Sequence, residues 1–356
     1  MRQVAPPANP SGKIEDERLI GARLGNYRLE KLIGHGNRSA VYQAKDITTW
    51  QTVAVRVIDG DLSADRAFVG RFRQEIARAK AVEHPNILPI LAQGEEEGRN
   101  YIARPFLDTG SLRDYLGQPM PIGKAIALFH PIAEALDFAH ARGLVHGDLK
   151  PGNILFDEAA KPLIADFGTA QALPGSNSFV ATARGEHVGT PEYVSPEQGR
   201  GAPFDKRADL YAFGVMLYEA LSGQPPFRAE SAADTPRALV MQHVSTPPPP
   251  ASSYYGEIGP ATDRILLRAL AKRPEERYSS ATALCAALAK VEEIAFVSPA
   301  TPFSDDTAGT IAAPESVDVT YIPRRQIQSQ HRRQYIMIAL GILVVVLLSL
   351  AFLLLR

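Results

Sequence analysis

The chain has 356 residues and a formal net charge of −1, and this length suggests two domains or one large one. Apolar residues make up 45% of the chain, which is usual for a globular protein and argues against a mostly disordered one. The near-zero charge gives no support to a nucleic-acid binder that relies on bulk basic charge. A single cysteine, Cys285, excludes an internal disulfide framework and a multi-thiolate metal site.

After a flexible leader at residues 1–23, the first third of the chain predicts a β-rich region. Turn residues separate the β-like segments, which are Tyr27–Ile33, Ser39–Ala44, Thr52–Ile58, Ile87–Ala92 and Tyr101–Arg104. One helical stretch, Asp65–Val82, interrupts these segments.

Helical spacing dominates from Leu112 onward. Apolar residues recur every three or four positions and predict one buried helix face, made of Ile122, Ile126, Phe129, Ala133 and Leu136. A small β-rich part followed by a larger helical part predicts an α+β fold with two lobes, residues 24–107 and residues 108–292.

The composition changes again towards the C-terminus. Residues 293–334 are predicted to form a polar juxtamembrane linker, and residues 335–355 a transmembrane helix. Between Ile336 and Leu355, 18 of 20 residues are apolar, and a helix of that length spans about 30 Å, the thickness of the hydrocarbon core of a bilayer. Four arginines precede this helix and only Arg356 follows it. The positive-inside rule then predicts a single-pass cell-membrane protein, with its main domain in the cytoplasm and its C-terminus just outside.

Five motifs in the body of the chain carry residues suited to phosphate chemistry. A glycine-bearing loop comes first, and its glycines let the backbone approach phosphate groups closely. A strand with one cation follows, with a glutamate 19 residues further on. Two motifs whose aspartates are 18 residues apart come next, and a Gly-Thr-Pro-Glu motif is last. In order, the motifs are Ile33–Tyr42, Val53–Val57 with Glu75, His146–Asn153, Asp166–Gly168 and Gly189–Glu197.

Taken in this order, the motifs resemble the signature set of the protein kinase family. The resemblance covers residues 27–290 and is closest to the bacterial membrane-anchored serine/threonine kinases with a eukaryotic-like fold. It implies a two-lobed kinase-like fold, with a β-rich N-lobe and a helical C-lobe. It also implies ATP with Mg²⁺ or Mn²⁺ as cofactors, and transfer of the ATP γ-phosphate to serine and threonine hydroxyls of proteins at the cytoplasmic face of the membrane.

The resemblance assigns chemical roles to individual residues. Asp148 is the expected base that accepts the proton of the substrate hydroxyl, and Lys150 is expected to contact the transferred phosphate. Thr190 is expected to bridge these two side chains. Asn153 and Asp166 are the expected ligands of Mg²⁺, a hard cation that prefers oxygen. Phosphoryl transfer depends on positioning and on neutralisation of charge, which acids, amides and cations at these places supply.

The resemblance also implies a nucleotide site between the two lobes. Val41, Ala54 and Leu155 resemble an apolar sandwich for adenine, and Leu107 can supply a hinge N–H group. The full set of expected nucleotide-binding residues is Ile33, Gly34, Gly36, Val41, Ala54, Arg56, Glu75, Leu107 and Leu155.

Four residues depart from the family pattern. Arg56 replaces the strand lysine, and a planar guanidinium differs from a compact ammonium at a phosphate clamp, although an ion pair of Arg56 with Glu75 can still form. Ser39 replaces the third loop glycine. Gly147 replaces the arginine that clamps a phosphate on the activation segment, so we expect activity to depend weakly on phosphorylation there. Arg104 aligns with the gatekeeper, from where the two arginines can share Glu75.

Two alternatives to a working serine/threonine kinase arise. One is a pseudokinase or scaffold with weak or no phosphotransfer, because Arg56 and Ser39 alter the phosphate clamp. The other is a small-molecule kinase of related fold, which the Gly189–Glu197 motif disfavours because it resembles a platform for protein substrates. The expected partners are protein substrates, a second copy of the chain for self-phosphorylation or dimerisation, and the membrane. Nucleic acid is not an expected partner.

A few further residues are expected to maintain the fold. The resemblance pairs Glu197 with Arg277 and places Asp209 under the catalytic loop. Cys285 lies in a helical stretch and is expected to be a packing residue.

Overall fold

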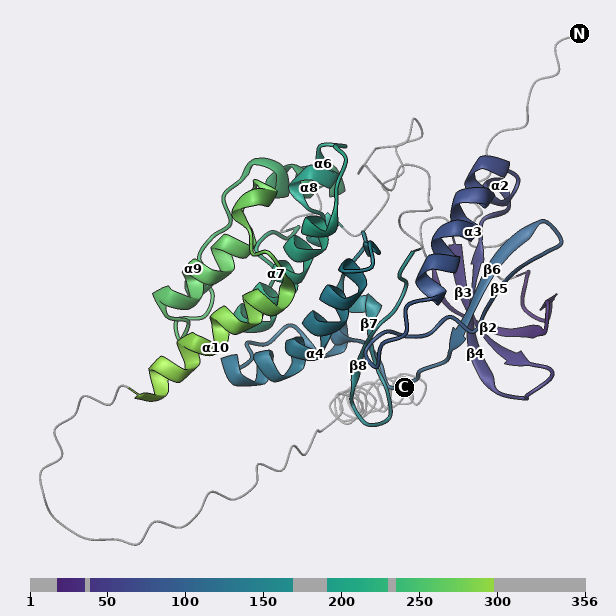
Figure 1. Ribbon diagram of the computed structural model, residues 1–356, viewed down its shortest axis with the longest axis horizontal. Helices are drawn as coiled ribbons and strands as arrows, with labels where there is room; N and C mark the ends of the chain where they lie inside the picture. Colours follow the sequence, from purple (N-terminus) through teal and green to yellow (C-terminus); the bar gives the residue numbers. More distant parts are fainter. Residues whose placement is uncertain (1–17, 36–38, 169–190, 230–234, 298–356) are drawn as a thin grey trace, which may run out of the picture. The chain divides into compact units, whose positions relative to one another are not determined.

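The computed structural model describes residues 18–35, 39–168, 191–229 and 235–297 (Figure 1). All of these residues lie in one compact unit of the chain, Met1–Pro299. An antiparallel sheet with one long helix comes first, and a mainly helical region follows. The predicted α+β fold with two lobes is therefore confirmed.

The N-lobe is built on a six-stranded antiparallel sheet with the strand order β1-β2-β3-β4-β6-β5. The strands are β1 (Arg23–Leu24), β2 (Tyr27–His35), β3 (Ser39–Asp46), β4 (Thr52–Ile58), β5 (Ala92–Glu96) and β6 (Arg99–Pro105). Four of the five predicted strands lie where the sequence placed them. Strand β1 was missed because two residues are too short to show a period-two alternation.

The predicted strand Ile87–Ala92 is wrong, because β5 begins only at Ala92. The residues before it connect α3 to the sheet, and Leu88 donates its N–H to the carbonyl of Ile164 in the C-lobe at 2.9 Å. Ile87 and Ile90 of this connection are buried in the core that both lobes share, and Leu88 is buried as well, whereas Leu91 is 44% exposed. The apolar run therefore reflects burial of a connecting segment and not pairing within a strand.

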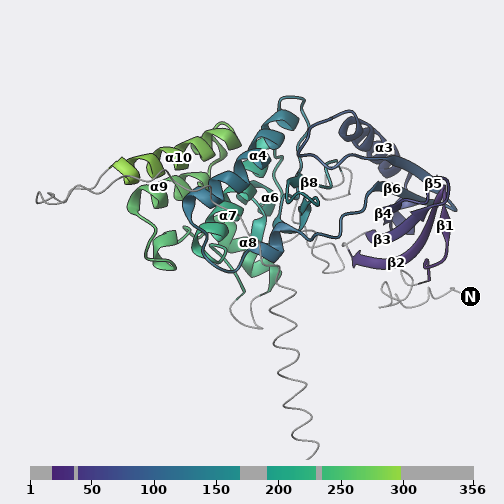
Figure 2. The ribbon, with the colours of Figure 1, turned by 90° about the horizontal axis from the view of Figure 1, so that it is seen from below.

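Helix α3 (Arg66–Lys80) packs against one face of the sheet (Figure 2). Its N-terminus is capped by Asp65, whose carboxylate accepts the N–H of Ala67 at 2.8 Å. The helix buries a stripe of apolar residues, Phe68, Phe72, Ile76 and Ala79. The predicted helical stretch is thus confirmed, and the short helix α2 (Gly60–Ser63) precedes it.

The two faces of the sheet belong to different environments. Val53, Val55 and Val57 of β4 are buried in a second apolar cluster on the face opposite α3. Because side chains alternate along a strand, Ala54 and Arg56 point to the other face. This face of the sheet is the one that carries the functional residues described below.

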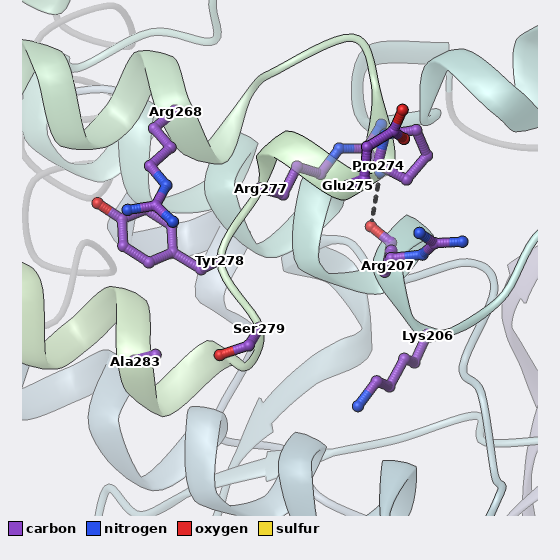
Figure 3. Close-up of a pocket in the computed structure, with 9 residues that line it drawn as sticks. All are labelled: Lys206, Arg207, Arg268, Pro274, Glu275, Arg277, Tyr278, Ser279 and Ala283. Atoms are coloured by element: carbon purple, nitrogen blue, oxygen red, sulfur yellow. Dashed lines mark hydrogen bonds between the residues drawn. The ribbon is translucent and has the colours of Figure 1, made fainter.

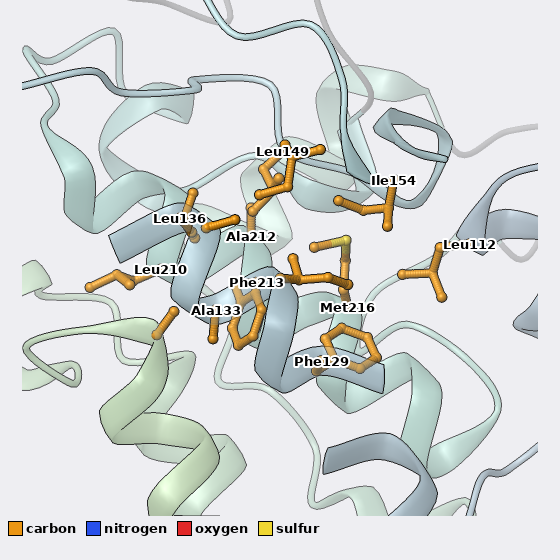
Figure 4. Packing of buried hydrophobic residues seen from close by; sticks show 14 of the residues in the cluster. Leu112, Phe129, Ala133, Leu136, Leu149, Ile154, Leu210, Ala212, Phe213 and Met216 are labelled. Atoms are coloured by element: carbon orange, nitrogen blue, oxygen red, sulfur yellow. The ribbon is translucent and has the colours of Figure 1, made fainter. Parts of the chain in front are cut away.

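The C-lobe is a group of helices around a buried apolar core (Figure 4). Its helices are α4 (Ile122–His140), α6 (Pro196–Gly199), α7 (Lys206–Ser222), α8 (Pro236–Ser245), α9 (Pro260–Ala269) and α10 (Ala281–Val297). A two-stranded sheet of β7 (Ile154–Phe156) and β8 (Pro162–Ile164) joins them, with 3-10 turns at Leu112–Tyr115, Pro151–Asn153, Pro191–Tyr193, Ala251–Ser253 and Pro274–Glu276.

Helix α4 packs the apolar face that its sequence predicts against the core, with Ile122 and Ile126 partly buried. Phe129, Ala133 and Leu136 are fully buried, and the ring of Phe129 meets that of Phe213 in α7 edge to face, with centroids 5.5 Å apart. Such contacts between α4 and α7 form the centre of the lobe. The loop that follows α4 therefore starts from a fixed position.

Two of the structural expectations are also confirmed. Both carboxylate oxygens of Glu197 accept from the guanidinium of Arg277, at 2.7 and 2.8 Å, and the Arg277 side chain is fully buried. Cys285 is buried as well, and burial raises the pKa of its thiol to about 12. A thiol in this environment is a packing group.

Within the described ranges, the helices are too short or too polar to cross a membrane. The predicted span at residues 335–355 lies outside these ranges, as do most of the predicted leader and linker. The membrane helix stays a prediction.

Candidate active site

The segment between α4 and β7 brings together Asp148, Lys150 and Asn153. Lys150 Nζ donates to Asp148 Oδ2 at 2.7 Å, and Asn153 Nδ2 donates to the carbonyl oxygen of Asp148 at 2.8 Å. The side chain of Asp148 is 35% exposed, so a hydroxyl from outside can reach its carboxylate. The segment therefore holds a proton acceptor beside a cation.

Asp209 of α7 fixes this segment from below, as the resemblance predicted. Its carboxylate accepts the N–H groups of His146 and Gly147, each at 2.8 Å, and His140 Nε2 lies 2.8 Å from its Oδ2. Burial alone raises the pKa of Asp209, but the hydrogen bond and charge of His140 outweigh this and lower it below its usual value. An ionised carboxylate thus anchors the backbone of the two residues that precede the expected base.

Gly147 has a left-handed backbone conformation, with a φ of +76°. Glycine adopts this conformation without the steric cost that a Cβ atom brings. Its carbonyl oxygen accepts from Gln198 Nε2 at 2.8 Å, so Asp209 and Gln198 together bond both of its backbone groups. The glycine suits the backbone here, and it removes the arginine that the family uses to clamp a phosphate.

Asn153 and Asp166 present the oxygen donors that a divalent cation prefers. The amide NH₂ of Asn153 is committed to the Asp148 carbonyl, which leaves its Oδ1 as the atom suited to a metal. Asp166 has a φ of +67°, a conformation that aspartate tolerates better than most residues. The next residue, Phe167, is buried against His146, with ring centroids 4.9 Å apart. The donor set fits Mg²⁺ or Mn²⁺.

Two arginines of the sheet hold the two carboxylate oxygens of Asp166. Arg56 Nη2 donates to Oδ2, and Arg104 Nη1 donates to Oδ1. The side chains of Arg104 and Asp166 are only 8% and 14% exposed. Burial alone raises the pKa of Asp166, but the charges of Arg56 and Arg104 outweigh this and hold the pKa well below its usual range. The expected metal ligand is therefore an ionised carboxylate with two guanidinium partners.

The expected ion pairs with Glu75 do not form among the described residues. Glu75 Oε1 instead accepts from Arg78 Nη1 of its own helix at 3.1 Å. Arg56 uses its Nη1 to donate to the Ser39 hydroxyl oxygen at 2.9 Å. Arg56 and Ser39, the two residues of the phosphate clamp that depart from the family pattern, are thus hydrogen-bonded to each other. The expectation that both arginines share Glu75 is corrected, since they share Asp166.

Several of the expected nucleotide-binding residues lie on one face of the sheet. Gly34 of β2 is opposite Val41 of β3, and Val41 is opposite Arg56 of β4. Ala54 is opposite Arg104 of β6. Side chains of directly opposed residues lie on the same face, so Val41 and Ala54, both expected at adenine, share a surface with Arg56 and Arg104.

The other expected nucleotide-binding residues lie in β2, just after β6 and in β7 of the C-lobe, or outside the described part. Ile33 is 42% exposed, and Leu107 and Leu155 are half-buried, as expected of residues that a ligand covers. Gly36 and Thr190 lie outside the described residues. Their roles stay predictions.

A family model described as a protein kinase domain matches residues 27–288. The chain belongs to the protein kinase family. The matched range spans both lobes and includes every motif singled out in the sequence. All the catalytic, nucleotide and metal residues discussed above fall inside it.

The curated relatives that this protein kinase matches include serine/threonine-protein kinases. It is 38% identical over 273 residues to serine/threonine-protein kinase PknB of Mycolicibacterium smegmatis, which covers 75% of this chain and 43% of that protein. It is also 38% identical over 274 residues to serine/threonine-protein kinase Pkn1 of Myxococcus xanthus, which covers 76% of this chain and 39% of that protein. The chain spans less than half the length of these curated relatives.

A solved structure shows the same architecture. The kinase domain of Mycobacterium tuberculosis PknI aligns with a TM-score of 0.59 and 27% sequence identity, and the alignment covers 77% of this chain and 98% of that domain. The agreement supports the two-lobed arrangement of the described residues.

The bond of Arg104 to Asp166 is the feature of this kinase site that sequence reasoning missed. The sequence did contain a hint of this bond, because Ala54 and Arg104 lie in two segments that were both predicted as strands. These segments pair with each other as β4 and β6. The pairing register was needed to place Arg104 on the face of Arg56. That register depends on the packing of the whole sheet.

A cavity of about 580 Å³ in the C-lobe is lined by several cationic side chains (Figure 3). Its arginines are already engaged: Arg277 Nη1 donates to the Arg207 carbonyl oxygen at 2.7 Å, and the guanidinium of Arg268 lies 4.4 Å from the centre of the Tyr278 ring. We therefore assign this cavity to the support of the fold and not to catalysis.

Proposed function

We propose that this protein kinase transfers the γ-phosphate of ATP to serine and threonine hydroxyls of proteins, itself included. The arrangement of Asp148 beside Lys150, with an Nζ–Oδ2 distance of 2.7 Å, carries the proposal. Asp209 and Asn153 hold this pair through the backbone. The serine/threonine kinases among its relatives support the same reaction.

The chain's own residues have separate tasks in this reaction. Asp148 orients the attacking hydroxyl and accepts its proton at the carboxylate. Lys150 neutralises charge on the phosphate as it moves. Asn153 Oδ1 and the Asp166 carboxylate hold a divalent metal, which supplies further charge neutralisation when bound.

The decisive experiment measures phosphate transfer from labelled ATP to the full chain and to a generic basic protein, with Mg²⁺ or Mn²⁺. Asp148→Asn keeps the size of the side chain and removes the proton acceptor, so we expect the rate to fall by about a hundredfold or more. Asp108→Asn, at an exposed position of the same lobe boundary, is the matched control and should keep the wild-type rate. Equal rates for wild type and Asp148→Asn contradict the proposal.

One observation favours a second candidate, a nucleotide-binding protein without phosphotransfer. Asp166 is held by two arginines, and their charges oppose a divalent cation at that carboxylate. This candidate predicts that ATP raises the melting temperature of the chain while labelled phosphate stays at the level of the Asp148→Asn variant.

We also propose that residues 335–355 anchor the kinase in the cell membrane, with the kinase domain in the cytoplasm and the C-terminus just outside. The apolar run and the arginines before it support this. Wild-type chain should resist alkaline extraction from membranes. Leu347→Arg with Leu348→Arg places two charges in mid-span and should release it. Release of the wild type under the same treatment contradicts the anchor.

A further inference from the structure

The cluster of Arg56, Asp166 and Arg104 holds an excess of positive charge in a mostly buried place. Their side chains are 22%, 14% and 8% exposed. Asp166 is the one carboxylate within ion-pair distance of either arginine in the part of the chain that the structure describes. Two guanidinium groups and one carboxylate sum to a charge of +1, and nearby Lys150 is already paired with Asp148.

The two arginines also have donors to spare. The Nε atoms of Arg56 and Arg104 are buried and have no hydrogen-bond partner. Buried donors are nearly always satisfied in a finished site. A polyanion next to Asp166 would balance the excess charge and accept from guanidinium N–H groups that turn towards it, so the cluster is suited to phosphate groups.

The sheet register explains why both guanidinium groups reach one carboxylate. Ala54 of β4 lies opposite Arg104 of β6, and Arg56 lies opposite Ile102. Arg56 and Arg104 are therefore diagonal neighbours on one face, at a separation that long side chains bridge easily. Both arise from rigid strands, so their convergence on Asp166 is a property of the fold.

The same charges act against a metal ion that arrives alone. A divalent cation at Asp166 would face two guanidinium groups at close range, and repulsion in a partly buried place is strong. With nucleotide phosphates present, the guanidinium groups gain better partners, because arginine pairs well with phosphate oxygens. The carboxylate then becomes available to a metal.

We propose that Arg104, together with Arg56, acts as an internal counter-cation at Asp166 that favours metal-free nucleotide phosphates and disfavours a divalent metal in the absence of nucleotide. The inference rests on the proposed function only in placing a nucleoside triphosphate and a metal next to Asp166. Neither of its readouts depends on phosphate transfer.

The first readout is the affinity of the full chain for Mn²⁺ alone, followed by electron paramagnetic resonance without nucleotide. Arg104→Met keeps an unbranched apolar stem and removes the charge, while Asp166 keeps Arg56 as its partner. We expect Arg104→Met to bind Mn²⁺ at least about tenfold more tightly than wild type. Adding Asp166→Asn to Arg104→Met should abolish the gain, which assigns it to this carboxylate.

The second readout is the affinity for ATP in excess EDTA, measured by calorimetry. Here Arg104→Met should bind at least about tenfold more weakly than wild type, because a positive charge beside the phosphates is lost. The two affinities thus move in opposite directions. A variant that merely disturbs the site would lower both.

Matched variants complete the test. Arg73→Met removes an exposed arginine of α3 that pairs with Glu95, and should leave both affinities at wild-type values. Arg104→Lys keeps the charge and should keep the low Mn²⁺ affinity of wild type. Arg104→Gln removes the charge but keeps a donor, and it replaces the methionine variant if that variant folds poorly. Unchanged Mn²⁺ affinity in both neutral variants, or a fall in both affinities, overturns the proposal. If the Mn²⁺ and ATP affinities shift in opposite directions as expected but the wild type transfers no phosphate, the result would count against the proposed function alone.

Discussion

At the scale of single residues, Gly147 shows how backbone geometry accounts for a departure from the family pattern. Its φ of +76° lies in the left-handed region, and hydrogen bonds from both sides keep it there. The same residue lacks the side chain that would hold an activation-segment phosphate. We therefore expect this one position to influence both the stability of the loop and the response to phosphorylation.

Gly147→Ala should destabilise the protein by about 1–2 kcal/mol, because a Cβ atom is strained at a left-handed φ. Urea unfolding with a probe of the kinase domain measures this loss. Gly70→Ala is the control, since Gly70 is exposed within α3 and has open space around it. That change should stabilise by about 0.5–1 kcal/mol. Equal effects of the two changes would contradict the argument.

The absence of an arginine at position 147 predicts weak dependence on activation-segment phosphorylation. Ser176, Ser178 and Thr182 are the candidate acceptors in the sequence, and they lie outside the described residues. Replacing all three by alanine should leave most of the transfer activity to a generic substrate, because the main receiver of such a phosphate is missing. Abolished activity in the triple variant would show that another receiver exists.

At the scale of elements, the ion pair of Glu197 and Arg277 ties α6 to the segment before α10. Arg277 also donates to the carbonyl oxygen of Arg207 in α7 at 2.7 Å. Its side chain is fully buried and that of Glu197 is 9% exposed. One guanidinium thus connects α6, α7 and the segment before α10 in the C-lobe.

Arg277→Met should cost about 3–5 kcal/mol of unfolding free energy, because it leaves the Glu197 charge buried without its partner. Arg273→Met breaks a pair with Glu275 whose side chains are 70% and 52% exposed, and should cost at most about 1 kcal/mol. Urea unfolding of both variants at one pH measures the difference. A similar loss for both would mean that burial of the pair is unimportant.

At the scale of the whole molecule, we expect the buried His243 to make the stability of the protein depend on pH. Burial and, next, the charge of Lys272 lower the pKa of His243 to about 3, and its Nδ1 lies 2.9 Å from the Tyr211 hydroxyl. The folded protein therefore keeps this imidazole neutral in mildly acidic solution. The unfolded chain protonates it near pH 6.5.

The sign of the effect follows from linkage. The unfolded state binds the proton first, so the stability from His243 is fully present above about pH 6.5 and is lost progressively as the pH falls towards 3. At pH 5.5 the loss should be about 1.4 kcal/mol. Urea unfolding of His243→Gln should show a shallower pH slope than wild type, whereas His130→Gln, at an exposed position, should keep it. An unchanged slope in His243→Gln would contradict this assignment.

The sequence by itself determined the family, the two lobes and the local part of the site. Asp148, Lys150 and Asn153 lie within six consecutive residues, so their spacing nearly fixes their meeting once the loop is held. Helix α4 was equally predictable, because a helical period in apolar residues is a local signal. The Glu197–Arg277 pair followed from the resemblance, since no local pattern links residues 80 positions apart.

The tertiary structure decided the partners of the charged residues in the site. Arg56 and Arg104 are 110 and 62 positions from Asp166 along the chain. The sequence had suggested Glu75 as the partner of both arginines. The choice depends on the register of β4 with β6 and on how the C-lobe brings Asp166 to that face. Such long-range contacts arise from the packing of the whole domain, because the hydrophobic pattern of a single strand fixes which side chains share a face but not what that face meets. The pair of arginines at Asp166, and with it the proposed control of metal binding, therefore became visible only in three dimensions.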